Sequence, residues 1–146
     1  LKGEPVMLSK PEYDWECRGF WVNEGPAVLF HGNKLFISYS ASATDENYCM
    51  GLLWIDLNAD PQNPLNWHKS PRPVFATSYE NRQYGPGHNS FTQTPEGEDV
   101  LVYHARNYTE IEGDPLYDPN RHTRLKLVRW DENGMPDFGI PPADTL

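Results

Sequence analysis

Two residues with ionisable side chains stand at matching positions of a pattern that occurs twice in the chain. Glu24 directly precedes Gly25-Pro26, and His88 directly follows Gly85-Pro86-Gly87. Trp21 and the apolar run after the Gly-Pro would desolvate the Glu24 carboxyl, which favours the protonated form that a general acid needs near neutral pH. The His88 imidazole could bind a metal ion, hold a water molecule or contact a substrate. The pattern therefore predicts acid chemistry at one position and a ligand contact at the other.

Ordinary structural roles remain open for both residues. Glu24 could cap a turn or pair with Arg18, and His88 could be a core histidine with hydrogen bonds inside the protein. His88 has no partner at the spacing of zinc ligands, so the sequence does not support a zinc site. Gly85 and Gly87 would allow the backbone to approach a ligand closely beside His88.

Three basic residues, Arg121, His122 and Arg124, lie at the end of a long polar loop. An arginine there could hold a substrate hydroxyl or keep a carboxylate ionised. Ordinary surface pairing is the alternative, and it is the safer interpretation of Arg124. The acidic segment 110–114 in the same loop lacks the ligand spacing of a known calcium loop.

These residues are placed by a repeat of roughly 60 residues, which is typical of a β-propeller blade. Each copy has a Gly-Pro that leads into a short apolar strand, a tight turn, a richer strand, a third strand and a proline-marked ending. In the first copy the elements from the turn onward are 31–34, 35–40, 48–57 and 72–75. In the second copy they are 95–98, 99–104, 124–130 and 135–139. A similar ending at 4–8 opens the chain.

The repeat predicts an all-β fold in which 23–83 and 84–146 are two four-stranded blades, and 1–22 is the end of a preceding blade and a loop. Fourteen prolines and eleven glycines interrupt any helical periodicity, so no helix is predicted. Segments 9–18, 59–71 and 107–123 are predicted as long polar loops, which are often functional. Since propellers typically have about four to eight blades, two cannot close a ring, and we expect the chain to be part of a longer one.

Composition limits the classes of partner. The formal net charge of -9 argues against nucleic acid, which requires a basic face, and fits a neutral partner such as a sugar. No stretch approaches the roughly 20 apolar residues that would span a membrane. Aromatic residues make up 13% of the chain and could serve as sugar platforms, although β-rich cores also use them. Cys17 and Cys49 make no disulfide framework, and Cys49 is predicted to be a small buried residue.

Three segments together resemble glycoside hydrolase family 43, and most of all its α-L-arabinofuranosidase members. They are Val22-Asn23-Glu24-Gly25-Pro26, Tyr84-Gly85-Pro86-Gly87-His88-Asn89-Ser90-Phe91 and Trp130-Asp131-Glu132-Asn133-Gly134-Met135-Pro136-Asp137-Phe138-Gly139. The resemblance covers residues 3–141, and the second segment, at its distance from the first, is the most specific part. It implies a five-bladed β-propeller that hydrolyses glycosidic bonds with inversion, of which this chain would be the last two blades.

The resemblance also implies roles for individual residues. Glu24 falls on the family's general acid, and His88 falls on a histidine near the channel centre that commonly contacts a metal, often calcium, directly or through water. Arg121 is the choice for the active-site arginine, with Arg124 as the fallback, and Trp21 and His88 are expected to contact the substrate. No organic cofactor is expected. The family's catalytic base and the aspartate that tunes the acid have no counterpart here and would belong to the missing N-terminal blades.

The second carboxyl group of the reaction is not visible in the sequence. Inverting hydrolysis uses two carboxyl groups about 6.5–9.5 Å apart. Nothing in the spacing of Asp14, Asp45 or Asp114 makes any of them the base opposite Glu24. The leading hypothesis is therefore a partial catalytic domain that releases α-L-arabinofuranosyl residues from arabinan or arabinoxylan, and that needs the remaining blades for activity.

Several other functions stay open. Within the family, β-xylosidase and endo-arabinanase activity are alternatives. A different class is a non-catalytic carbohydrate-binding module in which Trp15, Trp21 and Trp54 are the sugar platforms, and a proteolytic fragment with no separate role is a third possibility. The resemblance alone favours an extracellular or periplasmic location, with no nucleic-acid or membrane partner.

Overall fold

Strands provide the regular structure of residues 3–145, which the computed structural model describes, and short 3-10 turns are the only helical elements among them. The turns are Asp14–Glu16, Pro64–Asn66 and Pro115–Tyr117. The predicted all-β class is confirmed. Leu1, Lys2 and Leu146, the outermost residues of the predicted segments 1–22 and 84–146, lie outside the described residues. Within residues 3–145, no helix has the length and apolar character needed to cross a membrane.

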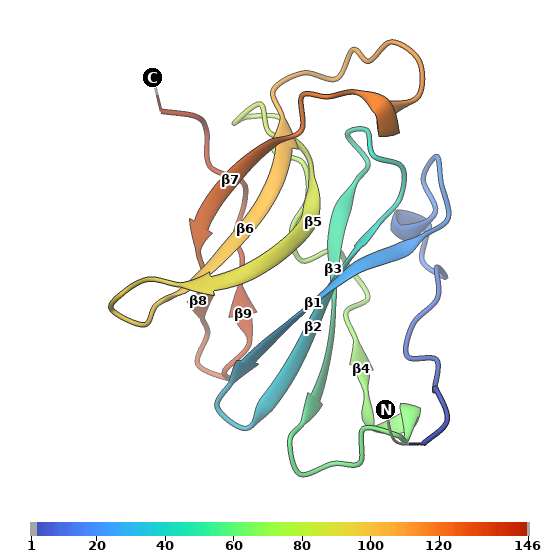
Figure 1. Cartoon of the computed structure of the whole chain (residues 1–146), viewed down its shortest axis with the longest axis vertical. Coiled ribbons are helices and arrows are strands. Elements are labelled where there is room, and N and C mark those ends of the chain that lie inside the picture. Colours follow the sequence, from blue (N-terminus) through green and yellow to red (C-terminus); the bar gives the residue numbers. More distant parts are fainter. Residues whose placement is uncertain (1–2, 146) are drawn as a thin grey trace.

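The first copy of the repeat folds into a four-stranded antiparallel sheet (Figure 1). Its strands, in sheet order, are β1 (Asn23–His31), β2 (Lys34–Ala41), β3 (Cys49–Asp56) and β4 (His68–Lys69). The last strand lies in a segment predicted as a loop, whereas the predicted ending at 72–75 adds only an isolated bridge between Phe75 and Met50. Prolines at 71 and 73 have no backbone N–H to donate, so the ladder cannot continue through this segment.

The second copy forms a three-stranded sheet and a separate small hairpin. The sheet contains β5 (Tyr84–Gln93), β6 (Asp99–Arg106) and β7 (His122–Leu127), and the hairpin pairs β8 (Arg129–Trp130) with β9 (Pro136–Asp137). The prediction of one third strand over 124–130 is therefore wrong, as is the prediction of a four-stranded second sheet. The strand breaks at Val128, whose N–H donates to Asp99 O while its side chain is buried in the core.

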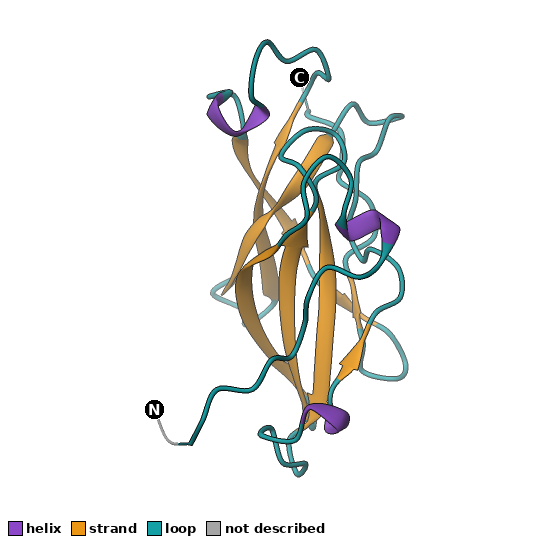
Figure 2. Cartoon of the chain, turned by 90° about the vertical axis from the view of Figure 1, so that its right-hand side faces the viewer, coloured by secondary structure: helices purple, strands orange, loops and turns teal. Residues whose placement is uncertain are grey.

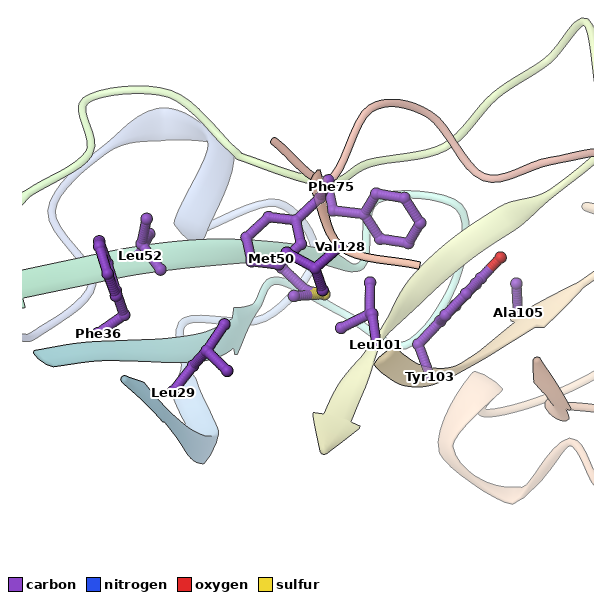
Figure 3. Close-up of a cluster of buried hydrophobic side chains, with 10 residues drawn as sticks. Leu29, Phe36, Met50, Leu52, Phe75, Leu101, Tyr103, Ala105 and Val128 are labelled. Atoms are coloured by element: carbon purple, nitrogen blue, oxygen red, sulfur yellow. The ribbon is translucent and has the colours of Figure 1, made fainter. Parts of the chain in front are cut away.

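The main core lies between the two sheets. Figure 3 shows Met50 of the first sheet and Leu101 of the second close to Phe75 and Val128, which come from the segments after each sheet. A smaller core on the other face of the first sheet is formed by Tyr39, Ala41 and Leu53. Figure 2 shows the segment before β1 running as a loop along the sheets, and its residues Leu8 and Trp15 pack against this smaller core. Both faces of the first sheet are thus partly covered, as expected for one blade in a radial stack.

Strands β1 and β5 pack against each other and bring the two matching positions together. Each strand begins with an irregularity, a register shift between Glu24 and Ala27 in β1 and shifts around Gly87 in β5. Bulges re-aim side chains near the ends of strands. The irregular starts of β1 and β5 therefore determine where the side chains of Glu24 and His88 point.

Candidate active site

Glu24 and His88 both lie close to the hydroxyl of Tyr48, a residue that was not predicted from the sequence. The hydroxyl of Tyr48 donates a hydrogen bond to Glu24 Oε1 at 2.7 Å, and it lies 3.5 Å from His88 Nδ1. Tyr48 is fully buried, whereas Glu24 is half-buried and His88 is exposed. The two residues predicted from the repeat therefore lie near the starts of β1 and β5, each within reach of one buried phenol.

The backbone around His88 holds its ring beside Glu24. His88 has a φ of 46°, and its N–H donates to Ser40 Oγ of β2 at 2.7 Å. A Cβ added to Gly25 would lie 3.3 Å from the His88 ring, and one added to Gly87 would lie 2.5 Å from Tyr48 Cε1. Gly87 was predicted to let the backbone approach a ligand. In the structure, the missing side chain of Gly87 instead leaves room for the Tyr48 ring.

His104 on β6 is a second residue that the sequence did not single out. Its ring stacks on Tyr48 with centroids 5.6 Å apart and planes 5° apart. Neither ring nitrogen has a hydrogen-bond partner among residues 3–145, although both are buried. Burial lowers the pKa of His104 to about 4, with further lowering from the nearby charge of Arg121. The ring is therefore neutral at neutral pH.

Arg121 lies in the same region of the structure as His88 and His104. It lines a hollow with His88, His104, Tyr117 and Asp118, and its Nη2 donates to Leu116 O at 3.3 Å. The fallback choice, Arg124, instead donates to Asp144 and to Asn107 Oδ1, away from the hollow. The geometry thus favours Arg121 over Arg124 as the arginine that can reach a ligand beside His88.

Trp21 occupies a more open position than predicted. Its side chain is 75% exposed, and the apolar residues that line the groove next to Glu24 are instead Phe20, Val22 and Leu116. Trp21 is therefore free to present a flat face to a ligand, while the apolar surroundings of the Glu24 carboxyl come from its other neighbours.

A buried arginine fixes the long loop that carries Arg121. Arg106 is 1% exposed, and its guanidinium donates to Asp118 Oδ1 at 2.9 Å, to Pro115 O at 2.7 Å and to Thr44 O of the first blade. The hydrogen bond from Arg106 holds the pKa of Asp118 below its usual value. The loop over 107–123 is thus tied to both blades. The sequence feature that could have indicated this role is the position of Arg106 at the end of an apolar strand.

The other acidic residues considered from the sequence have structural roles. Asp45 Oδ1 accepts the N–H of Asn47 at 2.8 Å, and Asp114 Oδ1 accepts the N–H of Leu116 at 2.9 Å. Asp14 begins the first 3-10 turn. Such bonds are those of carboxylates that stabilise turns. No geometry here assigns any of the three as a base opposite Glu24.

A model of the family described as glycosyl hydrolases family 43 matches residues 1–136 of the chain. The chain belongs to glycoside hydrolase family 43. The match covers both sheets and every residue of the site described above. The family resemblance read from the sequence is therefore confirmed.

Relatives within family 43 include two curated proteins and a solved structure. The chain is 57% identical over 145 residues to an extracellular exo-α-(1→5)-L-arabinofuranosidase of Streptomyces avermitilis and 50% identical over 145 residues to α-L-arabinofuranosidase 43 of Humicola insolens. These alignments cover 99% of this chain and 30% of each relative. The crystal structure of an α-L-arabinofuranosidase from Lactobacillus brevis superposes with a TM-score of 0.96 at 57% identity, over 100% of this chain and 46% of that one. The chain thus spans about a third of the length of the curated relatives that it matches, or less.

The described residues offer little to a metal ion. Among residues 3–145, no group of three or more His, Cys, Asp and Glu side chains is arranged to hold one. Calcium prefers six to eight oxygen ligands. His88 could therefore supply a single contact, directly or through water, and the other ligands of a calcium ion in this family 43 chain would have to come from elsewhere.

Proposed function

We propose that this chain is the C-terminal part of an inverting α-L-arabinofuranosidase, with Glu24 as its general acid. In this proposal 23–83 and 84–146 are the last two blades of a five-bladed propeller, and 1–22 ends the blade before them. The observation that carries the proposal is the hydrogen-bonded group of Glu24, Tyr48 and His88 at one end of β1 and β5, in a chain whose relatives are named arabinofuranosidases.

The reaction would proceed by direct displacement at the anomeric carbon. Glu24 gives its proton to the glycosidic oxygen as the bond from that oxygen to the anomeric carbon breaks. A water molecule attacks the opposite face of the sugar and gives a proton to a base, so the configuration is inverted. The base and the aspartate that tunes Glu24 would come from the remaining blades. Arg121 and His88 would hold substrate hydroxyls, and Trp21 would offer its exposed ring to a neighbouring sugar.

The substrate we propose is an arabinan or arabinoxylan side chain, cleaved from its end outside the cell. The names of the two curated relatives support this proposal, because both are α-L-arabinofuranosidases. One of the names also contains the words exo-α-(1→5) and extracellular. β-Xylosidase and endo-arabinanase activity are the alternatives within family 43, since loops outside this chain would help to shape the pocket. If calcium takes part, His88 would be its one contact from the described residues.

Replacement of Glu24 by Gln in the full-length enzyme tests the acid. We expect kcat on an α-1,5-linked arabinobiose to fall at least about 100-fold, because its leaving group needs a proton. Hydrolysis of 4-nitrophenyl α-L-arabinofuranoside should fall far less, because 4-nitrophenolate leaves unprotonated. Glu96→Gln, in an exposed turn between β5 and β6, is the matched control. Wild-type turnover of arabinobiose by Glu24→Gln would rule out the assignment, and proton NMR of the first product anomer tests inversion.

A carbohydrate-binding module is the second candidate, and the exposure of Trp21 favours it. The two other platform candidates are engaged in the fold, since Trp15 stacks on Tyr39 and Trp54 stacks on His68. Isothermal titration with arabino-oligosaccharides separates the two functions. Tight binding that Glu24→Gln leaves unchanged, with no product released by the full-length protein, would support the binding module.

A further inference from the structure

We propose that Tyr48 is a positioning residue for the general acid, and that His104 holds the Tyr48 ring in place. The inference rests on the proposed role of Glu24. Its basis is the hydrogen bond of 2.7 Å from the Tyr48 hydroxyl to Glu24 Oε1 and the stacking of His104 on the same ring. No other side chain among residues 3–145 donates a hydrogen bond to the Glu24 carboxyl in this structure.

The direction of the hydrogen bond selects one carboxyl oxygen for the chemistry. Because the Tyr48 hydroxyl donates to Oε1, the bond favours Oε1 as the carbonyl oxygen of the protonated carboxyl group, which places the acid proton on Oε2. Oε2 is then the atom that faces the glycosidic oxygen. Without Tyr48, the carboxyl could rotate or carry its proton on either oxygen, and fewer of its conformations would be productive.

The same bond becomes stronger as the reaction proceeds. When the Oε2–H bond breaks and the proton moves to the glycosidic oxygen, negative charge develops on the Glu24 carboxylate. A hydrogen bond to a charged acceptor is stronger than one to a neutral acceptor. Tyr48 therefore stabilises the transition state more than the bound substrate, which raises kcat rather than lowering KM.

Burial and close packing of the Tyr48 ring hold its hydroxyl in place. The ring is fully buried, His104 covers one of its faces at 5.6 Å between centroids, and Gly87 packs so closely that an added Cβ would lie 2.5 Å from Cε1. Burial raises the pKa of Tyr48 well above its usual value, and the hydrogen bond to Glu24 adds to this effect, so the phenol remains a donor. His104 supplies a neutral ring at neutral pH, which does not compete for the carboxylate.

The test is Tyr48→Phe in the full-length enzyme, which keeps the ring and removes the hydroxyl. We expect kcat on α-1,5-arabinobiose to fall about 10-fold, the worth of one such hydrogen bond, with KM changed less than about 2-fold. With 4-nitrophenyl α-L-arabinofuranoside, kcat should change less than about 2-fold, because little proton transfer is needed. The selective loss on the unactivated substrate is the signature of a group that acts through the acid.

Tyr39→Phe is the matched control. Tyr39 is also a buried tyrosine of the first blade, and its hydroxyl donates to the carboxylate of Glu16 at 2.9 Å. This variant loses an equivalent hydrogen bond, so its stability should fall as that of Tyr48→Phe does, but kcat on the two substrates should keep its wild-type ratio. Should Tyr48→Phe fail to fold, His104→Ala gives the same reading, with an expected selective loss of about 3-fold.

Four outcomes have distinct meanings. A selective loss of kcat on arabinobiose supports the inference. An unchanged kcat, or an equal fall on both substrates, overturns it and leaves Tyr48 a structural residue. If Glu24→Gln loses activity selectively while Tyr48→Phe does not, only this inference fails. If Glu24→Gln keeps its activity on arabinobiose, the proposed function itself fails.

Discussion

At the scale of single residues, the site depends on how closely side-chain rings can approach the backbone. Gly25 has a φ of 57° and lies against the His88 ring, and Gly87 lies against the Tyr48 ring. A side chain at Gly25 would be strained by the left-handed backbone as well as by contact. At Gly87 contact with Tyr48 is the main obstacle. These two glycines therefore allow the rings of His88 and Tyr48 to lie close to the backbone.

Gly87→Ala should displace Tyr48 from Glu24. The added methyl would lie 2.5 Å from Tyr48 Cε1, so the ring must move. We expect the free energy of unfolding to fall by about 1–3 kcal/mol, as for other overpacked sites. In the full-length enzyme, kcat on arabinobiose should also fall more than kcat on the nitrophenyl substrate. Urea unfolding and steady-state kinetics measure the two effects.

Gly51→Ala is the control for that substitution. Its methyl would lie 2.2 Å from Tyr39 Cζ, so it overpacks a tyrosine of the same sheet whose hydroxyl donates to Glu16 and not to Glu24. A comparable loss of stability is expected, with the wild-type ratio of the two kcat values. Wild-type kinetics on both substrates for Gly87→Ala would contradict the role given to the Tyr48 position.

At the scale of elements, the strands that follow simple alternation or a Gly-Pro start were predictable from the sequence. β1, β2, β3, β5 and β6 lie where the repeat predicts them. β4 and the break at Val128 were missed, because each depends on tertiary contacts: β4 pairs with β3 after a long loop, and the Val128 side chain enters a core shared with the first sheet.

The candidate site was predictable in the same uneven way. Glu24 and His88 stand at motif positions, so their types and spacing were informative. Tyr48 lies directly before β3, and His104 lies on β6. In the sequence, neither residue differs from the other aromatic residues of β-rich segments. Only the packing of the two blades stacks their rings at 5.6 Å. Contacts between blades have no signature in a single sequence, so no pattern could have identified this pair.

A buried carboxylate, Glu16, makes several of the hydrogen bonds that hold the segment before β1 against the first sheet. Glu16 has no exposed surface and accepts hydrogen bonds from the N–H groups of Glu12 and Tyr13. It also accepts from Lys69 of β4 at 2.9 Å, from Tyr39 Oη at 2.9 Å and from Asn23 Nδ2 at 3.0 Å. Asn23 is the first residue of β1, so this network also joins the segment to the start of that strand.

Glu16→Gln should destabilise the protein and reduce its sensitivity to acid. Removing one charge leaves the largely buried Lys69 ammonium with a weaker partner, and we expect a loss of about 2 kcal/mol at neutral pH. Glu12→Gln is the control, because its half-exposed side chain also contacts Lys69, and it should cost less than about 0.5 kcal/mol. Chemical unfolding of the three proteins measures these differences, and equal losses in both variants would contradict the role of Glu16.

The pH dependence of stability gives a second measurement on Glu16. Burial alone would raise its pKa, but the hydrogen bonds from Tyr13 N–H and Lys69 outweigh burial and lower the pKa below 4.5. A carboxyl with a lowered pKa in the folded state contributes stability above its unfolded value, and this contribution is lost as pH falls through its folded value. Stability should therefore fall below about pH 4.5 in the wild type, and more gently in Glu16→Gln. Parallel pH profiles would contradict this account.

At the scale of the whole molecule, the two sheets leave apolar side chains open on their outward faces. In β1, Leu29 points into the main core, so Val28 and Phe30 point to the opposite face, where they are 52% and 60% exposed. In β7, Leu125 and Leu127 are 64% and 47% exposed. Blades of a propeller cover such faces by packing against their neighbours. The two exposed pairs therefore mark the flanks where we expect further blades.

Leu125→Lys in the full-length protein tests this arrangement, with Leu65→Lys as its control. Leu125 is 64% exposed and Leu65 is 89% exposed in this structure, so each substitution should be nearly neutral if nothing else covers the chain. If a blade packs against β7, the lysine at 125 becomes buried without a partner, and the stability should fall by about 2 kcal/mol or more, while Leu65→Lys stays within about 0.5 kcal/mol. Melting temperatures of the two variants decide between these outcomes. Equal and small shifts would mean that the outward face of β7 stays uncovered and that the ring of blades does not close at this flank.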